Sequence, residues 1–220
     1  MTREFHEQIE HLRAQVLHMG AQARLNLIEG VQSLVRQDAA LARRVIQREE
    51  ELNRLDVQIE AEALSLLARN SPLAADLRTI GASFKIITYL DRIGRYGYDI
   101  AKVTLELVNR ELPRKPVAFT LMAEKAMAML DEALASYRKQ DAALARAVPE
   151  QDEVVDALYE QIFRDSITHM MEDPRTITTY AHYILVARHL ERAGDNARKI
   201  AEKALYMATG ERRLPITLPY

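Results

Sequence analysis

The stretch LDRIGRYGYDIAK at residues 90–102 is followed 100 residues later by LERAGDNARKIAE at residues 190–202. Both begin Leu-acid-Arg and carry a glycine at the same place, Gly94 and Gly194, within apolar residues spaced three or four apart. That spacing is typical of an amphipathic helix. A second motif, QDAALAR, occurs at 37–43 and again at 140–146. Because both motifs recur in the same order, we interpret the chain as a duplicated helical unit.

The composition also favours helices. Of 220 residues, 48% are hydrophobic and only seven are glycine and seven proline, while Ala, Leu, Arg and Glu are abundant. The apolar periodicity predicts six long antiparallel helices, near residues 5–36, 39–68, 73–110, 117–139, 142–171 and 174–208. Ser71-Pro72 and Asp173-Pro174 are each predicted to begin a helix, with a capping oxygen before a proline in the first turn.

These helices form two groups of three. The segment ELPRKP at 111–116 contains two prolines and predicts a break in the helical pattern. We therefore predict an all-α protein of two tandem, sequence-related three-helix bundles. The first spans residues 1–112 and the second 117–210, with a linker at 113–116 and an irregular tail at 211–220.

Several function classes are excluded or disfavoured. The 30 Lys and Arg nearly balance the 32 Asp and Glu, which gives no basic surface for nucleic acid. The absence of cysteine excludes thiolate chemistry and disulfides. No apolar run approaches the roughly 18 residues of a membrane span, and the charged N-terminus does not read as a signal peptide. We expect a cytoplasmic protein without membrane insertion.

No catalytic motif emerges from the sequence. It has neither a G-x-x-x-x-G-K-[ST] phosphate loop nor an H-E-x-x-H pair. None of the six histidines follows a glutamate by three residues, so the ligand pair of ferritin-like di-iron bundles is missing. His189 lies beside Glu191, but neighbouring residues on a helix point about 100° apart, which favours a surface or supporting role. We predict a protein that is not an enzyme.

Acidic residues in the second half suggest a metal site. Glu191 and Asp195 are four residues apart and share one face of their helix, since four residues advance by only about 40°. Asp152 and Asp156 have the same spacing on the preceding helix, with Glu160 one turn further on. Four carboxylates on two neighbouring helices are typical of a site for a hard cation, or for iron or manganese. The alternative is a solvated acidic face on which Glu191 pairs with Arg188 or Arg192.

The equivalent positions in the first half are altered. They are Glu49 and Asn53 on one helix and Asp91 and Arg95 on the next. We expect Arg95 to pair with Asp91 within its helix, supplying the charge that a metal would supply in the second half. Asp99 is one turn further on. A metal site at Glu49, Asp91 and Asp99 is therefore expected to bind weakly or not at all.

The repeated glycines also need a physical reason. A glycine inside a helix costs up to about 1 kcal/mol relative to alanine. Gly94 and Gly194 thus suggest that another helix or a ligand approaches the backbone closely at each position, and packing between helices is the simpler of the two.

The chain resembles the PhoU family of phosphate-specific transport system accessory proteins. The matching segments are SPLAADLRTI at 71–80, LDRIG at 90–94, MMEDPRTI at 170–177 and ARHLERAGDNARKIAE at 187–202. The resemblance implies two three-helix bundles, a cytoplasmic location, a homodimer and no catalytic activity. It also implies a negative regulator of the phosphate-starvation response, which links the ATPase subunit of the high-affinity phosphate ABC transporter to a phosphate-sensing histidine kinase.

Some members of this family bind iron or other metal clusters through acid-x-x-x-Asp motifs. These motifs match Asp152/Asp156 and Glu191/Asp195 here. The chain departs from the family pattern at Arg95, where the family usually has Asp, and at Ala193, where it usually has Ile.

Two other functions remain open from the sequence. One is a carboxylate-bridged metal-storage or metalloenzyme bundle. The other is a PhoU-like paralogue that regulates a different transporter.

Overall fold

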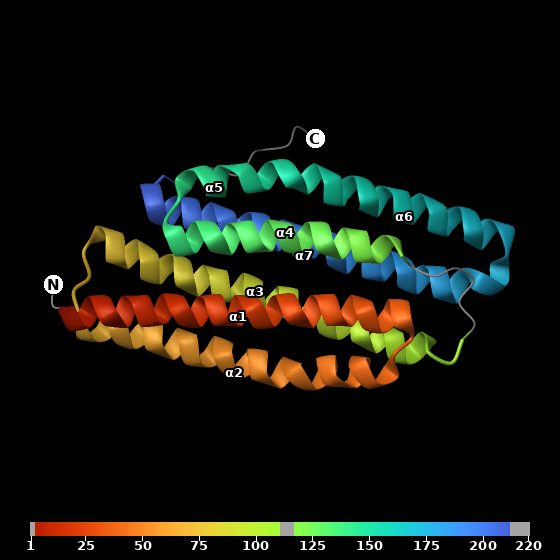
Figure 1. Cartoon of the computed structure of the whole chain (residues 1–220), viewed down its shortest axis with the longest axis horizontal. Coiled ribbons are helices and arrows are strands. Elements are labelled where there is room, and N and C mark those ends of the chain that lie inside the picture. The colour runs from red at the N-terminus through yellow and green to blue at the C-terminus, as the bar shows by residue number, and fades with distance from the viewer. Residues whose placement is uncertain (1–2, 111–116, 212–220) are drawn as a thin grey trace.

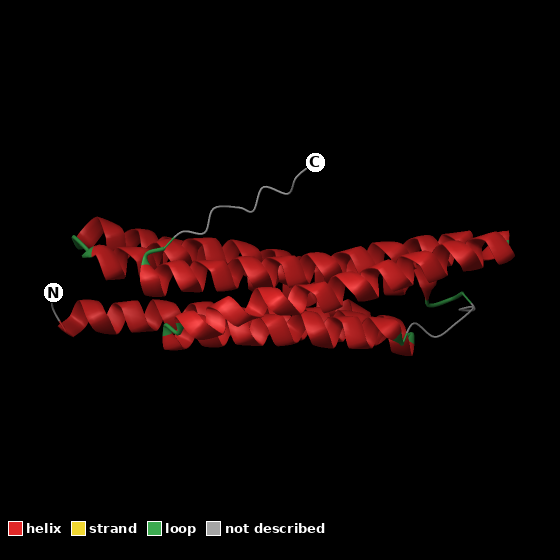
Figure 2. Ribbon diagram, turned by 90° about the horizontal axis from the view of Figure 1, so that it is seen from above, coloured by secondary structure: helices red, strands yellow, loops and turns green. Residues whose placement is uncertain are grey.

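The computed structural model describes residues 3–110 and 117–211. All regular structure in these residues is helical (Figure 2), which confirms the predicted all-α class. The predicted linker at 113–116 and nearly all of the predicted tail lie outside the described residues. No helix in the described ranges has an apolar stretch long enough to cross a membrane.

The first bundle consists of three long helices. They are α1 (Arg3–Arg36), α2 (Ala39–Arg69) and α3 (Ala74–Leu107). The prediction that Ser71-Pro72 caps α3 is wrong, because the helix begins at Ala74 after Leu73, whose backbone is extended (φ −75°, ψ 167°) and makes no side-chain cap. Since a proline disfavours helical geometry in the residue before it, Ser71 and Pro72 lie in the connection between α2 and α3 and outside both helices.

The second bundle repeats this plan with one interruption. It consists of α4 (Ala118–Lys139), α5 (Ala142–Ala147), α6 (Asp152–Glu172) and α7 (Ile177–Thr209). The prediction of one continuous helix over 142–171 is wrong, because a 3₁₀ turn at Val148–Gln151 separates α5 from α6. Pro149 lies in this turn and has no N–H to continue an α-helix. A second 3₁₀ turn, Pro174–Thr176, precedes α7. Asp173 caps this 3₁₀ turn, as predicted, by accepting a hydrogen bond from the Arg175 amide.

The repeated QDAALAR motif forms the same turn in both halves. Gln37 and Gln140 both adopt left-handed backbone conformations, with φ of 55° and 54°, and so end α1 and α4. The aspartate that follows then caps the next helix: Asp38 accepts from the Leu41 amide and Asp141 from the Ala143 amide, each at 2.9 Å. The motif therefore encodes a helix stop and a helix start in seven residues.

The two bundles pack lengthwise against each other. α3 contacts α7, and α1 contacts α4, whereas α2 and α6 lie at opposite outer edges of the molecule (Figure 1). Most buried apolar residues of both bundles form one continuous core, from Phe5 and Leu12 in α1 to Ala204 and Met207 in α7. A small separate cluster joins α2 and α3 at Ala42, Val45 and Ala101. The two repeats thus share an interior, while each keeps one outer helix, α2 or α6.

Glycines allow α1 and α3 to approach each other closely. A Cβ added at Gly97 would meet the main chain of Asn26 and Leu27 in α1, and one added at Gly30 would lie 2.5 Å from the Gly97 carbonyl oxygen. A Cβ at Gly94 would meet the Leu52 side chain, which confirms helix packing there. The same explanation does not hold for Gly194, since the nearest atoms to a Cβ at that position are 3.5 Å away, an ordinary contact distance.

Equivalent positions of the two repeats meet where α3 crosses α7. Tyr96 and Asn196 are 100 residues apart in the duplicated motif, and the Asn196 side-chain amide donates to the Tyr96 hydroxyl at 3.3 Å. The His189 ring stacks on the Tyr96 ring with centroids 5.5 Å apart. His189 therefore contributes to the contact between bundles, and burial lowers its pKa, with Arg192 acting in the same direction. Of the two roles predicted for His189, surface or supporting, the half-buried ring stacked on Tyr96 fits the supporting one.

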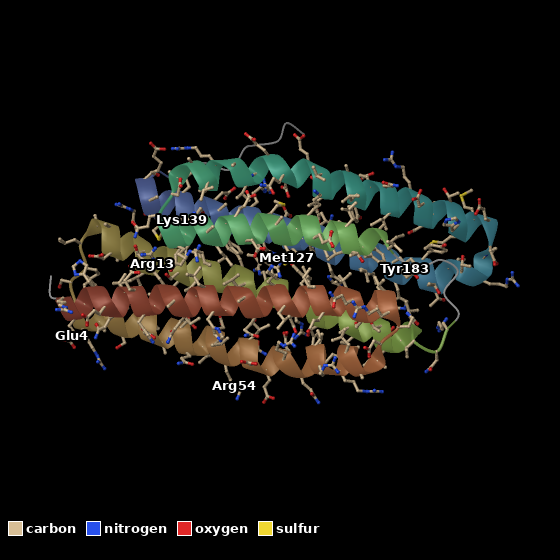
Figure 3. All side chains as sticks on the ribbon, viewed as in Figure 1. Glu4, Arg13, Arg54, Met127, Lys139 and Tyr183 are labelled. Carbon is tan, nitrogen blue, oxygen red and sulfur yellow. The ribbon has the colours of Figure 1, made fainter. Side chains whose placement is uncertain are left out.

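Arg13 joins the bundles at the other end of this interface. It is only 7% exposed and lies on α1 beside the end of α4, where Lys139 is labelled (Figure 3). Its guanidinium donates to the carbonyl oxygens of Tyr137 and Arg138 and pairs with Glu10 at 2.5 Å. Arg13 thus satisfies main-chain acceptors at the α4 C-terminus, which the helix itself leaves unpaired.

Candidate functional site

The predicted carboxylates of the second half do converge between two helices. Asp152 and Asp156 lie on α6, Glu191 and Asp195 lie on α7, and α6 packs on α7. We call these four residues the second-bundle cluster. Glu160, one turn beyond Asp156, is exposed.

An arginine lies at the centre of the second-bundle cluster. The Nε atom of Arg198 is 3.0 Å from Asp152 Oδ2, and its Nη2 atom donates to Asp195 Oδ1 at 2.9 Å. Arg198 comes from α7, three residues after Asp195, so it bridges its own helix to α6. Glu191 pairs instead with Arg188, with Nη1 3.2 Å from Oε1. This last pairing is the one expected if the acidic face needs no metal.

The carboxylates of this cluster are electrostatically crowded. Partial burial raises the pKa of Asp152, Asp156 and Glu191, and the neighbouring carboxylates raise them further. Burial lowers the pKa of Arg198, but its hydrogen bond to Asp195 and the charge of Asp152 outweigh that effect and raise it overall. Arg198 therefore stays charged and offsets much of the repulsion among the acids.

The first bundle has a similar arrangement. Glu49 and Asp56 on α2 lie near Asp91 and Asp99 on α3, and we call these four residues the first-bundle cluster. Arg95 donates from Nη1 to Glu49 Oε1 at 3.2 Å, and its Nε atom is 3.9 Å from Asp99 Oδ1.

Within the described residues, Arg95 does not form the ion pair with Asp91 predicted from their spacing. Its paired acids are Glu49 on the neighbouring helix and Asp99 one turn onward. The guanidinium also stacks over the Tyr98 ring, with Cζ 4.5 Å from the centroid. Burial raises the pKa of Asp91, and the nearby positive charge of Arg95 only partly opposes this.

The sequence did not point to Asp56 of the first-bundle cluster or to Arg198, which pairs with the second-bundle cluster. Asp56 belongs to the first-bundle cluster, because its pKa is raised by burial and then by the charge of Asp91. It lies seven residues after Glu49, a spacing of two helical turns that could have revealed it. Arg198 is three residues after Asp195, which is also a helical neighbour spacing. Asn53, the altered position between Glu49 and Asp56, is exposed.

The clusters as placed do not suit a resident metal ion. The described residues contain no group of three or more His, Cys, Asp or Glu side chains positioned to hold one. One carboxylate oxygen in each cluster is buried without a hydrogen-bond partner, Glu49 Oε2 in the first and Glu191 Oε2 in the second. In each cluster an arginine pairs with two of the acids, so those carboxylates already face a cation supplied by the protein itself.

The fold and the duplicated clusters define a class of protein built from two tandem helical-bundle repeats. Residues 16–104 and 119–204 each match the PhoU domain. The two matches together cover most of the chain, and each falls within one bundle. The chain therefore belongs to the PhoU family.

Individual relatives agree with this assignment. A phosphate-specific transport system accessory protein PhoU homolog from Rhizobium meliloti is 37% identical over 207 residues, which are 94% of this chain and 87% of the relative. The homolog with the same description from Pseudomonas aeruginosa is 34% identical and covers 96% of this chain and 87% of its own.

Solved structures show the same fold. The crystal structure of PhoU from Pseudomonas aeruginosa superposes with a TM-score of 0.89 at 34% identity, covering 94% of this chain and all of that one. The phosphate transport system regulatory protein PhoU from Streptococcus pneumoniae gives a TM-score of 0.86 at 26% identity, covering 94% of this chain and 98% of that one.

Proposed function

We propose that this chain is an accessory regulator of a phosphate transport system. The observation that carries the proposal is that both bundles match the PhoU domain and that relatives named as phosphate-specific transport accessory proteins align over almost the whole chain. The relatives therefore match both repeats together and not one of them alone.

The regulator acts in the cytoplasm as a non-enzymatic adaptor. It contacts the ATPase subunit of the high-affinity phosphate ABC transporter and a phosphate-sensing histidine kinase. When phosphate is plentiful, it keeps the kinase from activating the starvation response, and it is therefore a negative regulator of that response.

Exposed apolar side chains support an adaptor role. Leu73 and Leu77 flank the α2–α3 turn and are 69% and 50% exposed, and Met171 and Ile177 flank the α6–α7 turn and are 80% and 48% exposed. Leu77 and Ile177 are equivalent positions of the duplicated unit. The two connections lie at opposite ends of the molecule (Figure 1), so the chain offers two separate exposed apolar pairs as candidate contact points for partner proteins.

A phosphate-starvation reporter tests the regulatory role. Alkaline phosphatase activity is measured in phosphate-rich medium with the gene deleted and with the wild-type gene restored. We expect high activity in the deletion strain and low activity on restoration. Low activity in both strains would contradict the proposed role, and regulation of another transporter would then be the better explanation.

A double variant and a control test whether the α6–α7 turn contacts a partner without a change in the fold. Glu substitutions at both Met171 and Ile177 place charge on an exposed surface, so the helical content should persist while repression weakens. The matched control is Val57→Glu, on the outer face of α2, where Val57 is 66% exposed. Equal repression by both proteins would exclude the α6–α7 turn as a contact surface.

We also propose that the protein is a homodimer, and light scattering coupled to size-exclusion chromatography would measure its mass. A monomer mass at micromolar concentration would reject this part of the proposal without affecting the regulatory role. The divalent metal or iron site expected from the sequence at Asp152, Asp156, Glu191 and Asp195 is not part of this proposal, and the regulatory role does not depend on it.

A further inference from the structure

We propose that Arg95 and Arg198 take the place of metal ions in the two acidic clusters. Each guanidinium joins the last helix of its bundle to the helix before it and neutralises the acids between them. The protein then assembles both bundles without a metal cofactor. This inference concerns the clusters alone and does not depend on the role in phosphate transport.

The two arginines reach the same target from different positions of the repeat. Arg95 corresponds to Asp195, and Arg198 corresponds to Tyr98, so the two arginines occupy non-equivalent positions of the repeat. Their partners on the neighbouring helix nevertheless match, because Glu49 and Asp152 are equivalent residues 103 positions apart.

Each arginine also contacts an acid one turn away on its own helix. Arg95 reaches forward four residues to Asp99, and Arg198 reaches back three residues to Asp195. Both bundles therefore carry an acid, arginine, acid arrangement across the same pair of helices. Two non-equivalent positions of the repeat thus supply a positive charge to the same pair of helices.

The carboxylate oxygens that bind Arg198 are unavailable to a metal at the same time. A divalent cation binds carboxylate oxygens at about 2.0–2.6 Å and needs most of their lone pairs. Arg198 Nη2 donates a hydrogen bond to Asp195 Oδ1, and Arg188 Nη1 donates one to Glu191 Oε1. Arg198 Nε lies 3.0 Å from Asp152 Oδ2 in an ion pair without hydrogen-bond geometry. A guanidinium and a metal ion are both positive, so they also repel each other at this spacing.

Arg95 excludes a metal more completely. It occupies the position at which the second bundle has the ligand candidate Asp195. It also draws Glu49 Oε1 into a hydrogen bond, and Glu49 is only 7% exposed. In the first bundle the positive charge therefore replaces one candidate ligand and engages another.

Metal titration of three proteins tests the inference. Wild type, Arg198→Met and Arg95→Asp are dialysed against EDTA and titrated with Mn²⁺ by calorimetry, and thermal unfolding is followed by circular dichroism with and without the ion. The control is Lys203→Met, which removes one positive charge from α7 five residues beyond Arg198. Arg198→Met frees the second-bundle cluster, and Arg95→Asp restores a carboxylate to the first.

We expect wild type and Lys203→Met to show no saturable Mn²⁺ binding up to about 1 mM and the same melting temperature with or without EDTA. Each arginine variant should bind Mn²⁺ at least about 100-fold more tightly than wild type, because a cation has left the cluster. Mn²⁺ should also raise its melting temperature.

Stoichiometric metal in purified wild type, or a melting temperature that falls with EDTA, would overturn the inference. So would arginine variants that fold but bind Mn²⁺ no more tightly than wild type. If Arg198→Met does not fold, Arg95→Asp decides the question, because its cluster is separate and its arginine is more exposed, at 53% of the side chain.

Discussion

Replacing Gly97 by alanine tests how closely α1 and α3 must approach. The new Cβ would meet the main chain of α1, lying 2.5 Å from the Asn26 carbonyl carbon and 2.7 Å from the Leu27 nitrogen. These are backbone atoms of a buried helix and cannot rotate away as a side chain can. The two helices must therefore move apart over their whole crossing.

Two opposing terms set the magnitude. Overpacking of a well-filled interior costs about 1–3 kcal/mol, and the rigid backbone contacts place Gly97→Ala at or above the upper end. Alanine recovers about 1 kcal/mol through its higher helix propensity. The expected net loss is about 2 kcal/mol, or roughly 4–8 °C in melting temperature for a chain of this size.

Gly81 provides the matched control on the same helix. A Cβ there would meet nothing within 4 Å, so Gly81→Ala gains only the propensity term and should melt about 2–4 °C higher. Thermal unfolding followed by far-ultraviolet circular dichroism measures both. If Gly97→Ala melts at or above wild type, the close helix crossing is not a constraint and the reasoning fails.

Three further predictions follow from buried polar groups. Arg13→Met removes charged hydrogen bonds to the end of α4 and should destabilise the protein by about 2–3 kcal/mol, measured by urea unfolding. A loss below about 0.5 kcal/mol would mean that water replaces these hydrogen bonds freely. Burial raises the pKa of Tyr137 to about 12, so the Tyr137 hydroxyl keeps its proton to a higher pH in the folded state than in the unfolded state. The free energy of unfolding should therefore fall as the pH rises from about 10 to 12, and Tyr137→Phe should remove part of this pH dependence. Asp152→Asn loses its ion pair with Arg198 and should lower the melting temperature at neutral pH, whereas Asp156→Asn relieves carboxylate repulsion and should not lower it. An equal fall in melting temperature for both variants would contradict the proposed position of Arg198.

Most of the fold could be predicted because long amphipathic helices have a strong period. Six helical segments and the duplication followed from apolar spacing and two repeated motifs, and most predicted ends lie within a few residues of the observed ones. The errors occurred at prolines. Pro149 breaks a helix whose apolar period continues past it, and Pro72 lies outside the helix that it was predicted to begin.

The site was predictable only in part. Helical spacing correctly placed Asp152 and Asp156 opposite Glu191 and Asp195, because spacing along a helix fixes which face a residue occupies. The partner of each arginine was not predictable in the same way. A long flexible side chain chooses among several acids within reach, and that choice depends on the neighbouring helix, which spacing within one helix does not describe.

The tight glycine contact was missed for a related reason. Gly94 and Gly194 drew attention because they recur, but recurrence reflects the duplication and not the contact. Gly97 and Gly30 make the closest approach, and neither repeats as glycine in the second half, where Ala197 is the counterpart of Gly97. A close crossing depends on two helices, and only one of them is visible in any local motif.

The contact between Tyr96 and Asn196 shows what duplication within one chain permits. Equivalent positions of two repeats meet there, so two separate identical bundles would place the same side chain against itself. In a fused chain the two positions can diverge, and a large ring in α3 faces a smaller amide in α7 with a hydrogen bond between them. The clusters diverged in the same way, with Arg95 at one equivalent position and Arg198 at another. The two halves therefore keep one architecture while each supplies its charge and its close contacts from different residues.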